Sequence, residues 1–336
     1  MTMLARSTKL NHPSGSTFET PLLVPSFSSK GFAFKKKTGE SEIKKIFSIA
    51  SEYIETAMLV SAYDLFHAKL EPIQRAITEI TIVDSGGYEV SDFHDLSEIC
   101  LPLVHTLEWS MENLQRFYDN WPDYIPAIFV SFDHPKKRQS LQDQIEAARS
   151  LFARYPKQMH TFLIKPEKKD QQKIPINSII ANVNELRSFD IVGFTEKELG
   201  SSILDRMVNI AKIKHAMDDG AILMPIHVYG SLDPITSVLY FLSGGEIFDG
   251  LTWLRYGYAD GLACYYQNYA AKNIGIDRND DFVKAKTMQE NLSYLLKLTH
   301  QMRKFLLAWD FNVFKGNAEL LRDSFDLLKT KDKRIG

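Results

Sequence analysis

The chain has 336 residues, 44% of them hydrophobic and 24% charged, and a formal net charge of −2. This composition is typical of a globular protein with a substantial core, and the net charge excludes a uniformly basic nucleic-acid coat. Clusters such as Lys136-Lys137-Arg138 still allow a local basic face. The two cysteines, Cys100 and Cys264, exclude a disulfide framework and are typical of a reducing cytoplasm. We expect no membrane partner, because no apolar run approaches the roughly 20 residues that span a bilayer, and no signal peptide is evident.

Short apolar runs predict eight buried strands along the chain, at residues 21–25, 57–62, 80–84, 127–133, 160–165, 189–194, 222–229 and 246–251. Between them lie stretches with the apolar spacing of a helix, at residues 41–53, 140–154, 176–186, 196–217 and 234–242. The runs are almost continuously apolar, which indicates strands buried on both faces of a parallel sheet. Eight strands with crossovers favour an α/β fold of the (β/α)8 TIM barrel type, with a doubly wound open sheet as the alternative.

The last part of the sequence is mostly helical. Residues 287–308 and 319–329 have repeating apolar faces, and no internal repeat or low-complexity linker divides the chain. We therefore expect one domain over residues 1–336, with residues 262–336 as a helical C-terminal part.

The strand at residues 80–84 ends at a carboxylate and a glycine turn, in the order Asp84-Ser85-Gly86-Gly87-Tyr88. Two glycines free the backbone for tight turns and for close approach of a ligand. An ordinary strand–turn–helix connection with Asp84 as a helix cap is the alternative for this segment alone.

In a (β/α)8 barrel the active site lies at the carboxyl ends of the strands. Polar residues occupy that position on six of the predicted strands: Asp84, Asp133, Lys165, Thr195-Glu196, His227 with Tyr229, and Asp249. Three aspartates at one barrel end can divide three tasks, which are nucleophilic attack, proton transfer and recognition of N–H donors on a planar ligand. A divalent metal held by the same carboxylates is the alternative, while no His/Cys cluster has zinc spacing.

Five segments together resemble the tRNA-guanine transglycosylases and their DNA-modifying relatives, which exchange guanine for a 7-deazaguanine base. They are the family's T-P-x-x-x-P opening at residues 20–25, DSGGF/Y at 84–88, Ser131-Phe132-Asp133, F-D-x-x-x-x-x-R at Phe248 to Arg255, and N-L-x-Y at 291–294. The resemblance covers nearly the whole chain.

The resemblance implies a role for each matching residue. Asp249 would be the nucleophile that attacks C1′ of the target nucleoside, and Asp84 would protonate the leaving guanine and later deprotonate the incoming base. Asp133 would read the N–H edge of the base. Further contacts to the base are expected from Tyr88, Gly193, His227 and Lys165, the last standing where a base-contacting glutamine is usual, and Arg255 is expected to bind the nucleic acid.

Two departures from the family pattern shape the prediction. The family's zinc-binding cysteines are missing, since only Cys264 lies in that region, so neither a structural zinc nor another cofactor is expected. The arginine-rich stretch keeps Arg255 but loses a second arginine, which puts tRNA recognition in doubt. Residues 195–200 and 248–255 look more like the DNA-modifying branch.

The expected activity is therefore exchange of guanine in DNA for a base such as preQ0, with tRNA as the alternative polymer. A non-catalytic nucleic-acid-binding subunit and a metal-dependent barrel hydrolase are the rival functions. The resemblance also implies helper proteins that open DNA and a homodimer as partners, although the zinc region that supports the family's dimer is missing here.

Overall fold

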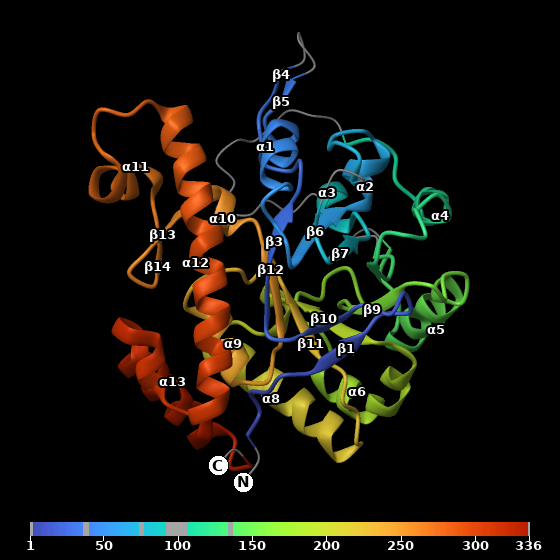
Figure 1. Ribbon diagram of the computed structural model, residues 1–336. Coiled ribbons are helices and arrows are strands. Elements are labelled where there is room, and N and C mark those ends of the chain that lie inside the picture. Colours follow the sequence, from blue (N-terminus) through green and yellow to red (C-terminus); the bar gives the residue numbers. More distant parts are fainter. Residues whose placement is uncertain (1–2, 36–39, 74–76, 92–105, 134–136, 335–336) are drawn as a thin grey trace.

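The computed structural model describes residues 3–35, 40–73, 77–91, 106–133 and 137–334. Its centre is a closed barrel of eight parallel strands, which confirms the predicted (β/α)8 fold (Figure 1). In barrel order the strands are β3 (Leu22–Phe27), β6 (Ala57–Ser61), β7 (Ile80–Asp84), β8 (Ala127–Val130), β9 (Met159–Ile164), β10 (Ile191–Thr195), β11 (Ile226–Tyr229) and β12 (Ile247–Gly250). Each of them overlaps one of the eight apolar runs in the sequence.

Alternation of side chains along each strand separates the barrel interior from the helix-facing side. Leu22 and Val24 of β3, and Ile80 and Ile82 of β7, pack together inside the barrel. The same alternation places polar residues at the next inward positions toward the carboxyl ends of the strands, which are Ser26, Ser61, Asp84 and Asp249. The interior is thus apolar at its centre and polar at its carboxyl end, where the predicted site residues lie.

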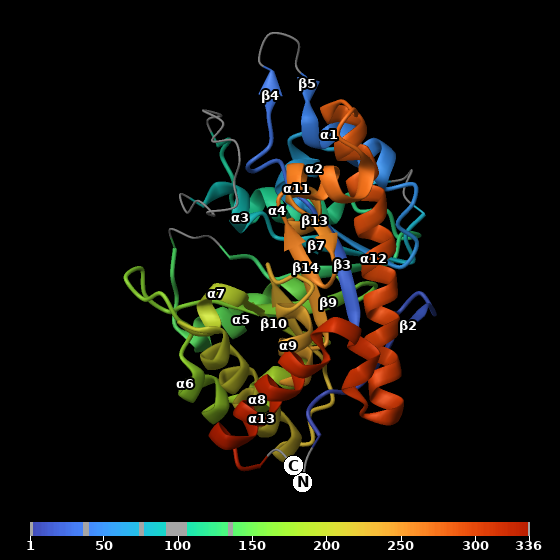
Figure 2. The ribbon, with the colours of Figure 1, turned by 90° about the vertical axis from the view of Figure 1, so that its left-hand side faces the viewer.

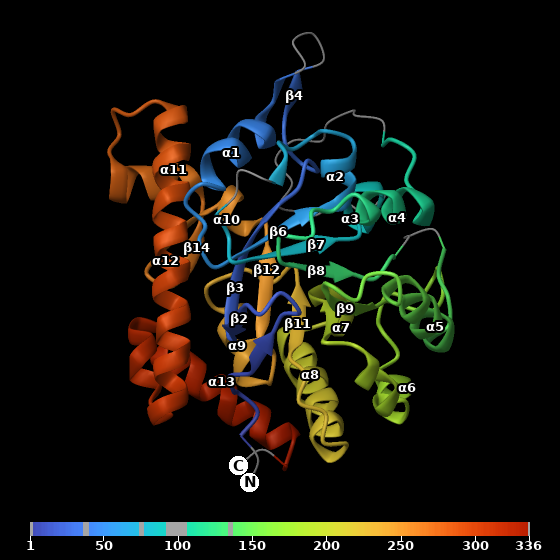
Figure 3. The same ribbon diagram turned by 45° about the vertical axis from the view of Figure 1, so that its right-hand side comes forward.

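The amino end of the barrel is covered by a hairpin that the sequence patterns did not predict. Strands β1 (Lys9–Asn11) and β2 (Thr17–Glu19) pair antiparallel. Each contributes one buried residue, Leu10 and Phe18, to the apolar interior of the barrel. Chain termini lie at this end, while α1, α2, α3 and α10 gather around the opposite end (Figure 3). The loops that could form a binding site are therefore those that follow the carboxyl ends of the barrel strands.

The five predicted helices between the strands appear in order, two of them divided. The structure adds short helices after β6, β7 and β12 and a longer one before β8, which the sequence patterns did not predict. In chain order the helices are α1 (Glu42–Ala50), α2 (Ala62–Phe66), α3 (Gly87–Val90), α4 (Met111–Asp119), α5 (Leu141–Phe152), α6 (Ile176–Ala181), the 3₁₀ helix η2 (Val183–Ser188), α7 (Glu196–Leu199), α8 (Ile203–Asp219), α9 (Thr236–Leu242) and α10 (Thr252–Arg255). The helix expected at residues 196–217 divides at Gly200, because Ser202 and Asp205 form a capping box that starts α8. The one expected at residues 176–186 divides into α6 and η2.

The C-terminal part begins with a small hairpin and continues as helices. In chain order it contains β13 (Gly257–Ala259), β14 (Leu262–Cys264), α11 (Tyr266–Tyr269), the π-helix η3 (Ala270–Ile274), α12 (Asp280–Ala308), the 3₁₀ helix η4 (Phe311–Asn317) and α13 (Ala318–Lys331). In the N-terminal half, β4 (Phe34–Lys35) and β5 (Glu40–Ser41) pair separately as an antiparallel two-stranded sheet. Helix α12 runs along the barrel in contact with β3 and β13, and α13 packs on α8 and α9 (Figure 2). Within the described ranges no helix is long and apolar enough to cross a bilayer.

Candidate active site

Asp249 lies on β12 near its carboxyl end and is held by three hydrogen-bond donors. Ser26 Oγ of β3 donates to Oδ2 at 2.7 Å, and the Gly230 backbone N–H donates to Oδ1 at 3.3 Å. The Nε2 atom of His227 lies 3.0 Å from Oδ1. Asp249 is only 5% exposed, so these contacts fix its carboxylate in one orientation. Three polar contacts around one carboxylate give it a defined direction of attack.

Asp84 ends β7 and has a different electrostatic environment. Burial, followed by the negative charges of Glu89, Asp133 and Asp249, raises the pKa of Asp84 well above its ordinary value. The Gly86 N–H donates to its Oδ2 atom at 3.3 Å and offsets only part of that effect. A carboxyl group with a raised pKa holds a proton and can give it to a leaving group.

The glycine turn after Asp84 is needed because other side chains lie against it. Gly86 has a φ of +87°, in the left-handed region that favours glycine. A Cβ atom at Gly87 would lie 2.3 Å from Oδ1 of Asp133. Asp133 also accepts a hydrogen bond from Ser85 Oγ at 2.7 Å. The turn therefore brings the Asp133 carboxylate directly against the Asp84 segment.

Lys165 follows β9 and joins two acidic groups at this end of the barrel. Its Nζ atom lies 2.9 Å from Glu198 and 3.6 Å from Asp133, and it donates to Thr195 Oγ1 at 2.8 Å. Burial lowers the pKa of Lys165, but Glu198 and Asp133 together outweigh burial and raise it. Lys165 therefore stays charged and neutralises part of the acidic surroundings of Asp133.

Tyr88 and Arg255 meet at the edge of the site. Arg255 is buried, and its Nη2 atom donates to Tyr88 Oη at 3.4 Å and to the Lys30 carbonyl at 3.3 Å. The Nζ atom of Lys30 lies 4.6 Å from the centre of the Tyr88 ring. All of these observed contacts are with other groups of the protein. Contacts of Tyr88 with a base and of Arg255 with nucleic acid therefore stay predictions.

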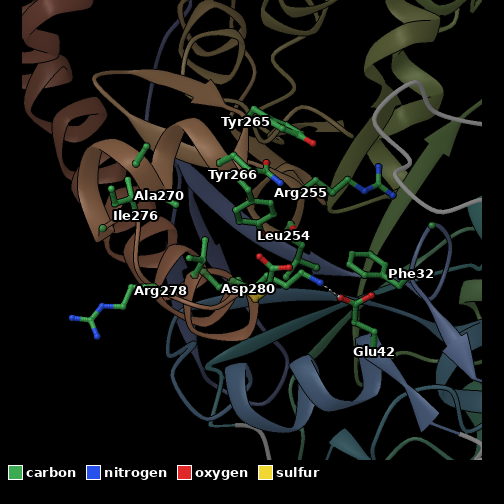
Figure 4. Close-up of a pocket in the computed structure, with 17 residues that line it drawn as sticks. Phe32, Glu42, Leu254, Arg255, Tyr265, Tyr266, Ala270, Ile276, Arg278 and Asp280 are labelled. Carbon is green, nitrogen blue, oxygen red and sulfur yellow. Dashed lines mark hydrogen bonds and ion pairs between the residues drawn. The ribbon is translucent and has the colours of Figure 1, made fainter.

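Arg255 also borders a separate cavity of about 420 Å³ (Figure 4). Phe32, Leu254, Tyr266 and the beginning of α12 line it, and the Lys284–Glu42 ion pair, 2.8 Å long, lies at its edge. The three site aspartates do not line this cavity. It therefore adjoins the candidate active site through Arg255 without being part of it.

Gly193 and His227 lie deeper than the resemblance implies. A Cβ atom at Gly193 would lie 2.6 Å from Cε2 of Tyr229, so the tyrosine ring occupies the space beside this glycine. His227 is fully buried and its ring stacks on Tyr229, with centroids 3.7 Å apart. The structure thus brings His227 to Asp249 and stacks it on Tyr229, which lies two residues nearer the carboxyl end of β11. Contact of either residue with a base stays a prediction.

Another strand-end residue, Glu196, has different surroundings from the site aspartates. Glu196 points to the helices, where it accepts hydrogen bonds from Arg206 and from the Tyr240 hydroxyl, each 2.7 Å long. Cys100 and residues 134–136, which include Lys136 of a predicted basic cluster, lie outside the described residues. In the parts of the chain that the structure covers, no group of three or more His, Cys, Asp and Glu side chains could hold a metal ion.

Sequence reasoning missed Glu89 and its neighbours. Glu89 is buried on α3 and accepts hydrogen bonds from Ser28 and Ser61. Asp64 on α2 is fully buried and accepts bonds from the Ser29 N–H and hydroxyl. Glu89 directly follows the DSGGY segment, which draws attention to it. Nothing in the local sequence, however, distinguishes it from a surface residue of a short helix.

Comparison with known proteins finds no matching family model and no matching curated protein. The site itself therefore supplies the argument for function.

Proposed function

We propose that this protein is a guanine transglycosylase that exchanges guanine in a polynucleotide, with DNA as the preferred polymer, for a 7-deazaguanine base such as preQ0. One observation carries the proposal. Two carboxyl groups at the same barrel end, the half-buried Asp84 and the buried Asp249, have contrasting environments. One is a proton-holding acid and the other is an oriented acceptor, which is the division of labour that retaining glycosyl transfer requires.

The mechanism has two displacements at C1′. An oxygen of Asp249 forms a bond to C1′ as the C1′–N9 bond breaks, and Asp84 gives its proton to the departing guanine. The incoming base then attacks C1′ through N9, the Asp249–C1′ bond breaks, and Asp84 takes the proton from the base. Both carboxyl groups return to their starting states.

The remaining site residues suit a planar base with N–H donors. The Asp133 carboxylate is an acceptor at the site edge, and Lys165 beside it supplies a cation and a donor. Tyr88 is an aromatic group on which an extruded base can stack, as polymer substrates of such enzymes must leave the helical stack. The preference for DNA rests on the likeness of residues 195–200 and 248–255 to the DNA-modifying branch.

The test offers purified protein duplex DNA, single-stranded DNA and tRNA together with labelled preQ0, and measures which polymer gains the label. Asp249→Asn and Asp84→Ala should each abolish incorporation while the thermal unfolding transition remains cooperative. The wild-type protein should also form a covalent adduct with DNA that Asp249→Asn lacks.

Three results would separate the alternatives. Label in tRNA but not in DNA would favour the tRNA enzyme. A protein that binds the polymer but gives neither incorporation nor adduct would favour a non-catalytic subunit. This result should hold with and without nuclear or cellular extract as a source of helper proteins. Activity lost in chelator and restored by a divalent metal would favour the barrel hydrolase.

A further inference from the structure

Glu89 is a buried carboxylate at the candidate active site that the proposed exchange mechanism does not use. It lies on α3, directly after the glycine turn, and is 6% exposed. A charged group is costly to bury unless other groups compensate it. The position of Glu89 near Asp84 therefore needs a structural explanation.

Two serine hydroxyls from different strands fix Glu89 in place. Ser28, just after β3, donates from Oγ to Oε1. Ser61, the last residue of β6, donates from Oγ to Oε2 at 2.8 Å. Both carboxylate oxygens thus have a hydrogen-bond partner, which holds the Glu89 side chain in one orientation.

Ser61 places this charge alongside Asp84. Ser61 and Asp84 are paired residues of the parallel strands β6 and β7, which lie about 4.8 Å apart. Both follow inward-facing residues by two positions, so both side chains point into the barrel. The hydrogen bond from Ser61 therefore holds Glu89 at the same edge of the barrel interior as Asp84.

We propose that Glu89 is a positioning residue whose fixed negative charge, held by Ser28 and Ser61 beside Asp84, makes Asp84 carry a proton before any ligand binds. This effect on Asp84 is independent of the exchange reaction. The use of that proton to release a base rests on the proposed function.

Other titratable groups also face these two carboxyls and must be separated from Glu89. Around them lie Asp133 after β8, Asp249 of β12, Tyr118 of α4, Tyr229 of β11, Asp64 of α2 with Lys69 after it, and Lys30 after β3. Burial is the largest cause of the raised pKa of Asp84, and Glu89 is the strongest of the charges, ahead of Asp133 and Asp249. Removing the Glu89 charge should therefore act on Asp84 more than removing either aspartate.

The test is a ¹³C NMR titration of the aspartate carboxyl groups, in which Asp84 is assigned by the signal missing from Asp84→Asn. In Glu89→Gln the titration midpoint of Asp84 should fall by about one pH unit or more, because a near like charge is lost. In Glu89→Asp, which keeps the charge, it should stay closer to that of the wild type. An unchanged midpoint in folded Glu89→Gln overturns the proposal.

Asp133→Asn is the matched comparison, because it removes the next strongest charge and should shift the midpoint less. A shift larger than that of Glu89→Gln would contradict the assignment to Glu89. Should Glu89→Gln fail to fold, the Ser28→Ala, Ser61→Ala double variant releases the carboxylate, and an unchanged Asp84 midpoint there overturns the proposal as well.

The pH dependence of base exchange separates this proposal from the proposed function. If both hold, the alkaline limit of the exchange rate moves to lower pH in Glu89→Gln by the same amount as the NMR midpoint. A shifted midpoint in a protein that exchanges no base at any pH supports the role of Glu89 and contradicts the transglycosylase activity.

Discussion

His227 Nε2 lies 3.0 Å from Asp249 Oδ1, and the same imidazole ring stacks on Tyr229 with centroids 3.7 Å apart. The histidine is therefore held on one side by an aromatic ring and on the other by the carboxylate. An ionised Asp249 requires a proton on Nε2 for this contact to be a hydrogen bond. His227 is fully buried, and its Nε2 atom contacts the site at Asp249.

We expect His227→Phe to lower kcat for base exchange while changing KM little. The phenyl ring keeps the stacking on Tyr229 but removes a donor to a charged group, worth about 1.5–3 kcal/mol, or roughly tenfold to a hundredfold in rate. Steady-state kinetics with labelled base measures both constants. Tyr229→Phe is the control, because it keeps the stack and leaves the donor to Asp249. A loss confined to KM would point instead to direct contact between His227 and the base.

Asp64 should make the protein less stable as pH rises. Burial, and then the charge of Glu89, raise the pKa of Asp64 from 3.8 to about 7 in the folded state. The folded protein thus keeps a proton that the unfolded chain releases, so this contribution to stability is complete below about pH 4 and is lost as pH rises through 7. The loss amounts to about 4 kcal/mol at most, from a difference of about three pKa units.

Urea unfolding of wild type and Asp64→Asn between pH 4 and pH 8 measures this contribution. The amide of asparagine can accept from the Ser29 N–H and donate to its hydroxyl without titrating, so the variant should lose less stability over the range. Asp123→Asn is the control, since Asp123 is exposed and forms a surface ion pair with Lys157, and the pH dependence of this variant should match that of the wild type. Equal slopes for all three proteins would contradict the raised pKa of Asp64.

The barrel was predictable from sequence because each strand is a short apolar run and the strand ends carry polar residues. The positions of Asp84, Asp133 and Lys165 were predicted in this way, because a polar residue after an apolar run indicates the carboxyl end of a strand. The contacts of Asp249 with Ser26 and His227 were not, because they join strands that are distant in the sequence. Local pattern gives the strand on which a residue lies, but the register between strands decides which side chains meet.

The surroundings of Glu89 and Gly193 also depend on contacts between strands, which local sequence does not predict. The burial of Glu89 depends on serines of two other strands, so its own short helix carries no sign of it. Base contact by Gly193 stays a prediction, and its lack of a side chain admits the Tyr229 ring from the neighbouring strand, which the local sequence did not indicate. The hairpin that covers the amino end of the barrel was missed because its strands are short and each buries a single residue.

Gly87→Ala should destabilise the protein and displace Asp133. An added Cβ atom would lie 2.3 Å from Oδ1 and 2.5 Å from the backbone oxygen of Asp133, and the backbone cannot swing away as a flexible side chain can. Overpacking of this kind costs about 1–3 kcal/mol, measured by urea unfolding. Gly316→Ala is the control, because nothing lies within 4 Å of its added Cβ atom. Equal stability of the two variants would show that the turn can relax.

Lys165→Met should be destabilising because it removes the cation that the half-buried Asp133 and Glu198 share, while Glu198 keeps the longer contact with Arg138, 3.9 Å. Lys165 is 14% exposed in its side chain, and removing one partner of a buried ion pair costs about 3 kcal/mol. Lys157→Met is the matched control: it breaks the Lys157–Asp123 pair, whose side chains are 71% and 70% exposed, and should change the free energy of unfolding by less than about 1 kcal/mol.

Urea unfolding at pH 7 compares the two lysine variants directly. A Lys165→Met protein as stable as Lys157→Met would mean that Arg138 and solvent, rather than Lys165, compensate Asp133 and Glu198.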